Sequence, residues 1–240
     1  GIVIDGTLVK TASKRNPSEL PWKEMNVDVV LECTGVYTTG ESAKAHIEAG
    51  ARKVIISAPA KGVDGTFVVG VNDGDLDPVN HTIISNASCT TNCLAPTARL
   101  LDKLVGIESG MMTTVHSYTM DQNILDAPHR KGKFRRARAA AQNMIPTTTG
   151  AAQALSVVLP ELAGKIHGMA VRVPTANVSM IDLVINASRN TTVEEVNAAF
   201  QAAAAGPLKG ILGVTAKPLV SSDLMSDPHS TTVDLSLTTV

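Results

Sequence analysis

The first third of the chain alternates short apolar runs with a helical pattern, and this rhythm restricts its fold. The expected strands are residues 27–35, 53–60, 67–72 and 81–87. Between the first two lies a helical pattern, residues 40–51, with Ala43, Ile47 and Ala51 on one face. Strands that are apolar on both faces and joined through helices are typical of a buried parallel sheet. The sequence therefore predicts an α/β sheet, preceded by a hairpin in residues 1–10.

The pattern changes after residue 89. The later strand-like runs alternate apolar with polar residues, as half-exposed strands of a mostly antiparallel sheet do: residues 111–120, 171–187 and 230–240. The clearest helix between them begins with a capping box of Thr192 and Glu195 and ends at Gly206. The fold class predicted is thus α/β plus α+β. We place the domains at residues 1–88 and 89–240.

Composition excludes several classes of function. The 240 residues carry 21 Lys and Arg against 22 Asp and Glu, a net charge of -1, with no long basic run, and aromatic residues make up 2%. We therefore expect neither a nucleic-acid partner nor a membrane segment. Three cysteines argue against a disulfide framework and for a reducing compartment, and no zinc-type spacing predicts a metal.

Cys89 is expected at the joint between the strand 81–87 and a helix with apolar residues at helical spacing. A thiol at a helix N-terminus has its pKa lowered by the positive end of the helix dipole, and the same N–H groups hold an oxyanion. Ser88 and Thr90 add hydroxyls on either side. The alternative for any single cysteine is a small buried apolar residue, which fits Cys33 and Cys93.

A thiolate nucleophile needs a base, and His116 is the best placed of the six histidines. It lies 27 residues after Cys89 in a β-branched strand that would return beside that helix. Ser117, Tyr118, Thr119 and Asp121 follow it and favour a site over a half-buried structural histidine.

Two stretches and one strand residue suggest anion binding. Arg135, Arg136 and Arg138 stand at the front of an expected helix, and the segment 147–150 (TTTG) precedes another. A solvated basic face and an ordinary threonine cap are the alternatives. Arg172 is different, because it lies in an apolar strand and should meet an anion or a carboxylate.

The segments ASCTTNCLAP, VHSYTMDQ, RRARAAA, IPTTTGAA and RVPTANVS occur in this order. Together they closely resemble the phosphorylating glyceraldehyde-3-phosphate dehydrogenases. The resemblance implies a partial Rossmann-type parallel sheet and a catalytic domain. It implies glycolytic oxidation of a phosphorylated aldehyde through a thioester, with NAD as hydride acceptor (NADP not excluded) and inorganic phosphate as acyl acceptor. It also implies a cytoplasmic homotetramer.

The resemblance assigns roles residue by residue. Cys89 is the nucleophile, His116 the base, and Thr119 and Arg172 hold the phosphate of the substrate. The residues around the attacking phosphate are Ser88, Thr90, Arg136, Thr149 and Gly150. The residues along the dinucleotide crevice are Arg15, Thr34, Gly35 and Ser57. Of these, Thr34, Gly35, Ser57 and also Ser88 are independently expected at the carboxyl ends of parallel strands, where ligands bind.

Departures and alternatives accompany the resemblance. The family's glycine-rich fingerprint belongs before Gly1 and its last helix after Val240, so we expect a fragment of a longer chain that by itself binds dinucleotide poorly. Met120 stands where the family usually has Asn, and Ala127-Pro128 matches neither common cofactor-preference pair fully. The alternatives are an erythrose-4-phosphate dehydrogenase, with the same Cys and His, and a cysteine acyl hydrolase or transferase.

Overall fold

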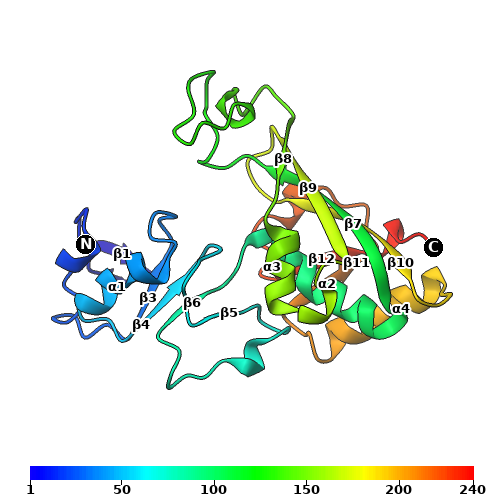
Figure 1. The fold of residues 1–240 in the computed structure, drawn as a ribbon, viewed down its shortest axis with the longest axis horizontal. Helices are drawn as coiled ribbons and strands as arrows, with labels where there is room; N and C mark the ends of the chain where they lie inside the picture. Colours follow the sequence, from blue (N-terminus) through cyan, green and yellow to red (C-terminus); the bar gives the residue numbers. More distant parts are fainter. The chain divides into compact units, whose positions relative to one another are not determined.

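The computed structural model describes all 240 residues as two compact units (Figure 1). Unit 1 comprises Gly1–Phe67 and Gly74–Ala87, and unit 2 comprises Val68–Asp73 and Ser88–Val240. No helix has both the length and the apolar character needed to cross a bilayer.

A four-stranded parallel sheet forms the centre of unit 1. Its order is β3 (Val29–Glu32), β4 (Lys53–Ile56), β6 (Ile83–Ser85) and β5 (Gly65–Thr66). All three pairings are parallel, and α1 (Gly40–Glu48) packs against β4 and β6. Val54, Ile56 and Ala43 are fully buried between them. The predicted α/β class is confirmed.

The expected hairpin at the start of the chain is also present. β1 (Ile2–Ile4) pairs antiparallel with β2 (Thr7–Val9). Asp5 and Gly6 at the turn both have positive φ, 47° and 77°. Two successive residues with positive φ are what a two-residue hairpin turn requires, and an Asp-Gly pair supplies them at low cost.

Residues 67–72 do not form the predicted strand. The strand in this region is the short β5, and after it the side chains of Asn72 and Asp73 bind the backbone N–H groups of Val68 and Gly70 at 2.9 and 2.7 Å. Such local side-chain bonds compete with a strand ladder. The apolar run therefore closes into a turn that belongs to unit 2.

Unit 2 contains a four-stranded mixed sheet. Its order is β10 (Met180–Ala187), β7 (Ile107–Ser117), β9 (Ile166–Val173) and β8 (Ile145–Thr148). The two outer pairings are antiparallel and the β7–β9 pairing is parallel. The helices α2 (Cys89–Val105) and α3 (Ala151–Val158) contact each other and pack against this sheet (Figure 1). The mostly antiparallel sheet with helices agrees with the prediction.

The C-terminal strand is an exception to that prediction. β12 (Thr231–Asp234) pairs parallel with β11 (Leu212–Thr215) in a separate two-stranded sheet. Its buried neighbours come from α4 (Val193–Ala205), where Val196 and Phe200 pack with Leu212 and Leu235. A small apolar cluster against α4 therefore draws this segment away from the main sheet.

The predicted capping box of α4 is only half formed. The Thr192 hydroxyl accepts from the Glu195 N–H at 3.2 Å, but the Glu195 carboxylate binds Arg189 and Thr191 instead of returning to the cap. The helix ends at Gly206 as expected. Short 3-10 turns complete the chain: Pro17–Glu19, Asp73–Asp75, Arg135–Ala137, Pro160–Leu162, Ser221–Leu224 and Leu235–Leu237.

The prediction of a helix from Arg135 onward is wrong. Only the 3-10 turn Arg135–Ala137 forms, and Arg138 is already extended. The carboxylate of Asp126 accepts from the Ala139 N–H at 2.7 Å and from Arg138 Nε at 3.0 Å. Because this carboxylate holds the backbone in a non-helical conformation, the segment stays irregular until β8.

Candidate active site

Cys89 is the first residue of α2, as the sequence predicted. Ser88 caps the helix: its hydroxyl accepts from the Thr91 N–H at 3.1 Å and lies 2.7 Å from the Thr91 hydroxyl. The helix continues through Pro96 to Val105. The cap places the Cys89 thiol at the positive end of a 17-residue helix, where a thiolate is favoured.

The thiol of Cys89 faces the imidazole of His116. Cys89 Sγ lies 3.4 Å from His116 Nε2, and His116 Nδ1 donates to the Ser117 carbonyl at 2.7 Å. That second bond fixes a proton on Nδ1 and leaves Nε2 for the thiol. His116 is buried, whereas Cys89 is exposed and open to a reactant.

Each partner shifts the pKa of the other toward the charged form. The hydrogen bond from His116 lowers the pKa of the Cys89 thiol despite partial burial, and the backbone N–H of Thr90 lowers it further. The bond to Cys89 raises the pKa of His116. Both shifts favour a thiolate paired with an imidazolium, the arrangement that activates a cysteine as a nucleophile.

The strand register brings Arg172 to the same site. His116 of β7 pairs with Arg172 of β9. Arg172 Nη1 donates to the Thr119 hydroxyl at 2.6 Å and to Gln122 Oε1 at 3.2 Å. It forms no ion pair with a carboxylate, and its buried Nε has no partner. Of the two predicted partners, a carboxylate of the chain is therefore not the one, and an anion stays the prediction, because the guanidinium keeps unused capacity to bind one.

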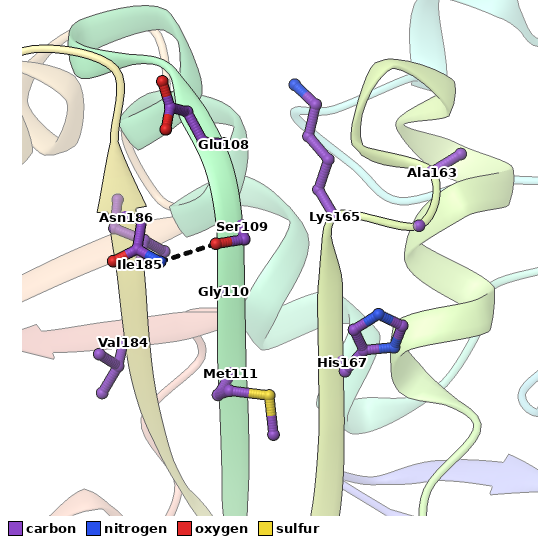
Figure 2. Close-up of a pocket in the computed structure, with 11 residues that line it drawn as sticks. Glu108, Ser109, Gly110, Met111, Ala163, Lys165, His167, Val184, Ile185 and Asn186 are labelled. Atoms are coloured by element: carbon purple, nitrogen blue, oxygen red, sulfur yellow. Dashed lines mark hydrogen bonds between the residues drawn. The ribbon is translucent and has the colours of Figure 1, made fainter.

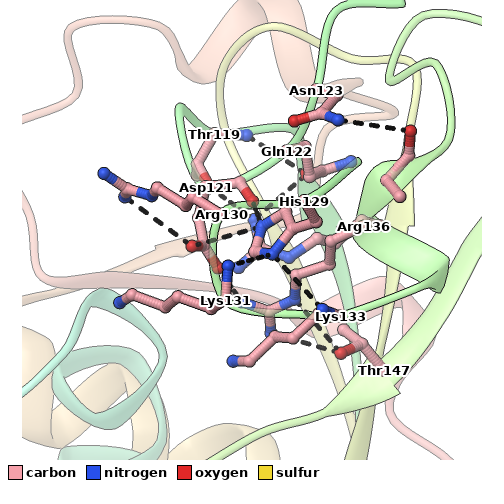
Figure 3. Close-up of polar contacts among 12 residues, drawn as sticks. Thr119, Asp121, Gln122, Asn123, His129, Arg130, Lys131, Lys133, Arg136 and Thr147 are labelled. Carbon is pink, nitrogen blue, oxygen red and sulfur yellow. Dashed lines mark hydrogen bonds and ion pairs between the residues drawn. The ribbon is translucent and has the colours of Figure 1, made fainter. Parts of the chain in front are cut away.

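Arg136 is held in a different way (Figure 3). It forms an ion pair with Asp121, and its Nε and Nη2 donate to the Thr147 hydroxyl at 3.3 and 3.2 Å. Burial raises the pKa of Asp121, but the hydrogen bond and charge of Arg136 outweigh it, so the pKa is lowered. Arg136 therefore starts paired, in contrast to Arg172.

Thr149 and Gly150 stand at the N-terminus of α3. Gly150 is the N-cap, and the Thr149 hydroxyl accepts from the Ala151 N–H at 3.2 Å. Arg136 binds Thr147 and the Thr148 carbonyl, not Thr149. The structure thus connects Cys89 with His116 and Thr119 with Arg172, but it joins Arg136 to neighbours of the predicted phosphate residues.

Gln122 is a site residue to which sequence reasoning gave no role. It is buried, and its Oε1 accepts from both the Thr119 N–H, at 3.2 Å, and Arg172. Its Nε2 has no partner. The signal was present in the quoted segment VHSYTMDQ, where a polar amide follows three residues after Thr119.

Three of the four residues expected to face a dinucleotide lie just after the carboxyl ends of β3 and β4 in unit 1. Thr34 donates its N–H to Glu32 Oε1 at 2.7 Å, and Ser57 donates its N–H to the Glu32 carbonyl at 3.0 Å. Gly35 has a φ of +69°, and a Cβ added there would meet nothing within 4 Å. Hydroxyls beside a left-handed glycine at this edge fit a dinucleotide.

Two predicted positions are less closely defined: Arg15, expected along the dinucleotide crevice, and Ser88, expected beside the attacking phosphate and at the carboxyl end of the strand 81–87. The Arg15 carbonyl accepts from the Tyr37 hydroxyl at 3.0 Å, and its side chain is exposed. Ser88 belongs to unit 2, so its place along the unit 1 edge stays a prediction. No cluster of three or more histidine, cysteine or acidic side chains is arranged to hold a metal ion.

A surface hollow of unit 2 lies away from these groups (Figure 2). It is lined by residues near the start of β7, among them Glu108 and Met111, and by Lys165, His167 and Val184. His116 lies toward the other end of the same strand. The hollow therefore shares no residue with the thiol site.

A parallel α/β sheet suited to a dinucleotide, together with a second unit that holds a cysteine–histidine pair, is typical of one class of protein, the NAD(P)-dependent oxidoreductases. Residues 88–240 match the family model described as glyceraldehyde 3-phosphate dehydrogenase, C-terminal domain, and residues 1–40 match that of its NAD binding domain. The chain belongs to the glyceraldehyde-3-phosphate dehydrogenase family. Its cofactor is NAD, and the resemblance read from the sequence is confirmed.

Proteins with names of this family are similar to the chain over nearly all of its length. Glyceraldehyde-3-phosphate dehydrogenase 2 of Streptomyces avermitilis is 54% identical, covering 100% of this chain and 71% of that protein. Glyceraldehyde-3-phosphate dehydrogenase 1 of Bacillus cereus is 56% identical over 97% of this chain and 69% of its own length. The chloroplastic glyceraldehyde-3-phosphate dehydrogenase B of Pisum sativum is 58% identical over 100% of this chain and 53% of its own length.

Proposed function

We propose that this protein oxidises glyceraldehyde 3-phosphate to 1,3-bisphosphoglycerate in glycolysis, through a thioester on Cys89. The observation that carries the proposal is the 3.4 Å contact between Cys89 Sγ and His116 Nε2, one strand pairing away from the Arg172–Thr119 bond. A nucleophile next to a free arginine suits an aldehyde that carries a phosphate.

The first step is addition. The Cys89 thiolate forms a carbon–sulfur bond with the aldehyde carbon, and the carbonyl oxygen becomes the hydroxyl of a thiohemiacetal by taking the proton from His116. Backbone N–H groups at the start of α2 favour the developing oxyanion. Arg172 and Thr119 hold the phosphate of the substrate, which fixes the aldehyde carbon near the sulfur.

The second step is oxidation. The residues at the carboxyl edge of the unit 1 sheet would hold NAD, which would supply the acceptor for the hydride and its two electrons. His116 Nε2 takes back the hydroxyl proton, so that the carbon–oxygen bond becomes the carbonyl of a thioester. The His116 Nδ1 bond to Ser117 keeps the ring oriented throughout both proton transfers. A base at this position contributes about 10²- to 10⁴-fold to such a step.

The third step transfers the acyl group. An oxygen of inorganic phosphate attacks the thioester carbon, the carbon–sulfur bond breaks, and the thiolate returns to its pair with His116. The residues proposed to hold this phosphate are Ser88, Thr90, Arg136, Thr149 and Gly150. The α3 N-terminus favours an anion beside the last two of these residues. Two anion seats correspond to the two phosphates of the product.

The cofactor and domain assignments complete the proposal. Arg15, Thr34, Gly35 and Ser57 would hold NAD in a dinucleotide-binding part at residues 1–88, and residues 89–240 form the catalytic and substrate domain. Three free cysteines suit a reducing compartment, which supports a cytoplasmic location. The exposed apolar residues Met111, Met180 and Val184 on β7 and β10 support a subunit interface of the proposed homotetramer.

The test is the rate of NADH formation from glyceraldehyde 3-phosphate, with and without inorganic phosphate. We expect a rate that depends on phosphate and that Cys89→Ser abolishes while the unfolding temperature stays the same. Erythrose 4-phosphate serves as the competing substrate. A faster rate with that aldehyde, or acyl release to water without any need for phosphate, would refute the proposal.

A further inference from the structure

Unit 1 contains a series of hydrogen bonds, centred on a buried Glu32–His46 pair, that the proposed mechanism does not use. Glu32 and His46 are 3% and 4% exposed, and Glu32 Oε2 lies 2.9 Å from His46 Nε2. His46 Nδ1 in turn lies 3.1 Å from Trp22 Nε1. The other carboxylate oxygen, Oε1, faces both the N–H and the hydroxyl of Thr34. These hydrogen bonds link Trp22 to the sheet edge proposed to bind the cofactor.

The chemistry of the four side chains fixes which atom donates and which accepts in each of these hydrogen bonds. An indole N–H only donates, so His46 Nδ1 accepts. The ring is then neutral with its proton on Nε2, which donates to Glu32. Glu32 Oε1 is therefore left as an acceptor for both donors of Thr34. Every link has a fixed donor and a fixed acceptor.

This arrangement of donors and acceptors determines what Thr34 offers to a ligand. Its hydroxyl proton points to Glu32, and its oxygen also accepts from the Val36 N–H at 3.1 Å. The lone pair that remains on the oxygen is an acceptor only, suited to a hydroxyl or amino donor rather than to a phosphate oxygen. The Glu32 carbonyl also accepts from Ser57 N and Oγ, at 3.0 and 3.2 Å. Glu32 thus contacts two of the proposed cofactor residues.

We propose that Glu32, His46 and Trp22 are positioning residues that hold the Thr34–Gly35 turn in the conformation that accepts the dinucleotide. This positioning role rests on the proposed function only in that the ligand is taken to be NAD. A charge buried in an apolar unit is costly unless it is fully bonded, and an apolar pair serves stability as well or better. A carboxylate whose free oxygen ends on a ligand-facing turn is better explained by control of that turn.

Three histidine variants of the complete polypeptide test the proposal. His46→Leu removes the N–H that fixes Glu32, whereas His46→Gln keeps a donor near Nε2. His81→Leu is the matched control, because it removes another imidazole of unit 1 whose partner is the Asp77 N–H. The measurements are NAD affinity by calorimetry, KM for NAD and kcat, amide hydrogen exchange of residues 33–36 without cofactor, and the unfolding temperature.

For His46→Leu we expect NAD affinity to fall about tenfold, KM for NAD to rise in parallel, and kcat to change little, since bonds to charged groups are worth about that much. Exchange at residues 33–36 should accelerate by a similar factor. His46→Gln should restore most of the affinity, and His81→Leu should match the parent protein. A purely structural role would instead lower the unfolding temperature and leave NAD affinity and local exchange unchanged, which would overturn the proposal.

Glu32→Gln keeps the experiment decisive if His46→Leu fails to fold. A carboxamide has one acceptor oxygen, so its NH₂ must face either the donors of Thr34 or the donor of His46. The same loss of NAD affinity is expected, and parental affinity would contradict the proposal. Calorimetry measures NAD binding without turnover. If the parent protein forms no NADH, the proposed function is refuted, but NAD affinity can still be compared between the parent protein and its variants.

Discussion

Replacing His116 by asparagine isolates the role of one nitrogen atom. An Asn amide nitrogen takes the place of His116 Nδ1 and keeps its bond to the Ser117 carbonyl, but nothing replaces Nε2, 3.4 Å from Cys89 Sγ. The variant should therefore fold normally and lose the partner that lowers the pKa of the thiol. We expect the alkylation profile of Cys89 to move to higher pH.

The distance sets the size of this effect. Two unit charges 3.4 Å apart interact by about 1 kcal/mol in water and by about 5 kcal/mol at an effective dielectric constant of about 20. Because the Cys89 side chain is exposed, the lower part of this range applies. Alkylation at pH 7 should slow by roughly ten- to a hundredfold, with a larger loss of kcat because the proton acceptor for the oxidation step is also lost.

The assay is the rate of iodoacetamide alkylation from pH 5 to 10, read as Cys89 adduct by peptide mass spectrometry. His167→Asn is the matched control, since it removes an exposed imidazole from β9 of the same sheet. That control should keep the parent profile. An unchanged profile in His116→Asn would refute the assigned role, because the thiol would then owe its lowered pKa to the helix terminus alone.

Three other predictions concern separate parts of the molecule. Arg172→Leu should raise KM for glyceraldehyde 3-phosphate at least tenfold and KM for inorganic phosphate much less, and equal increases in steady-state assays would contradict the division of the anion seats. Gly40→Ala should lower the free energy of unfolding by about 1–3 kcal/mol in urea titrations, because its Cβ would collide with a backbone carbonyl, whereas Gly74→Ala meets open space. The bond to Arg189 lowers the pKa of Glu195 to about 2. Its folded pKa is below the unfolded one, so its contribution to stability is present above about pH 4.5 and is lost as the pH falls toward 2; a carbon-detected NMR midpoint near 4.5 would contradict this.

The parts of the site that could be predicted from sequence depend on local rules. The position of Cys89 follows from a strand pattern, a cap at Ser88 and helical spacing, all within about twenty residues. The start of α3 after Gly150 follows from similar local signals. His116 required one further rule, that a strand following a helix returns beside it, and the structure agrees with that rule.

The features that the sequence did not predict correctly have a common physical cause. Specific side-chain hydrogen bonds, some local and some between residues farther apart in the sequence, override the periodic pattern of apolar residues. Asp126 accepts from the backbone 13 residues later and prevents the helix expected after Arg135. Asn72 turns a run of apolar residues away from the sheet. The bond between Glu32 and His46 spans 14 residues and leaves no periodic pattern in the sequence. Such hydrogen bonds form only where the fold brings the two groups together, so neither composition nor residue spacing predicts them.

The two arginines of the site show how one carboxylate separates their roles. Asp121 pairs with Arg136, while Arg172 has a hydroxyl and an amide as partners, and burial followed by the charge of Arg136 lowers its pKa. An anion bound at Arg172 offsets both the desolvation cost of the buried guanidinium and its repulsion by Arg136, and no existing ion pair has to break. An anion at Arg136 must compete with Asp121. The free energy of binding should therefore favour the Arg172 seat for the phosphate that must stay bound through all three steps, and the weaker seat suits a phosphate that enters only after the thioester has formed.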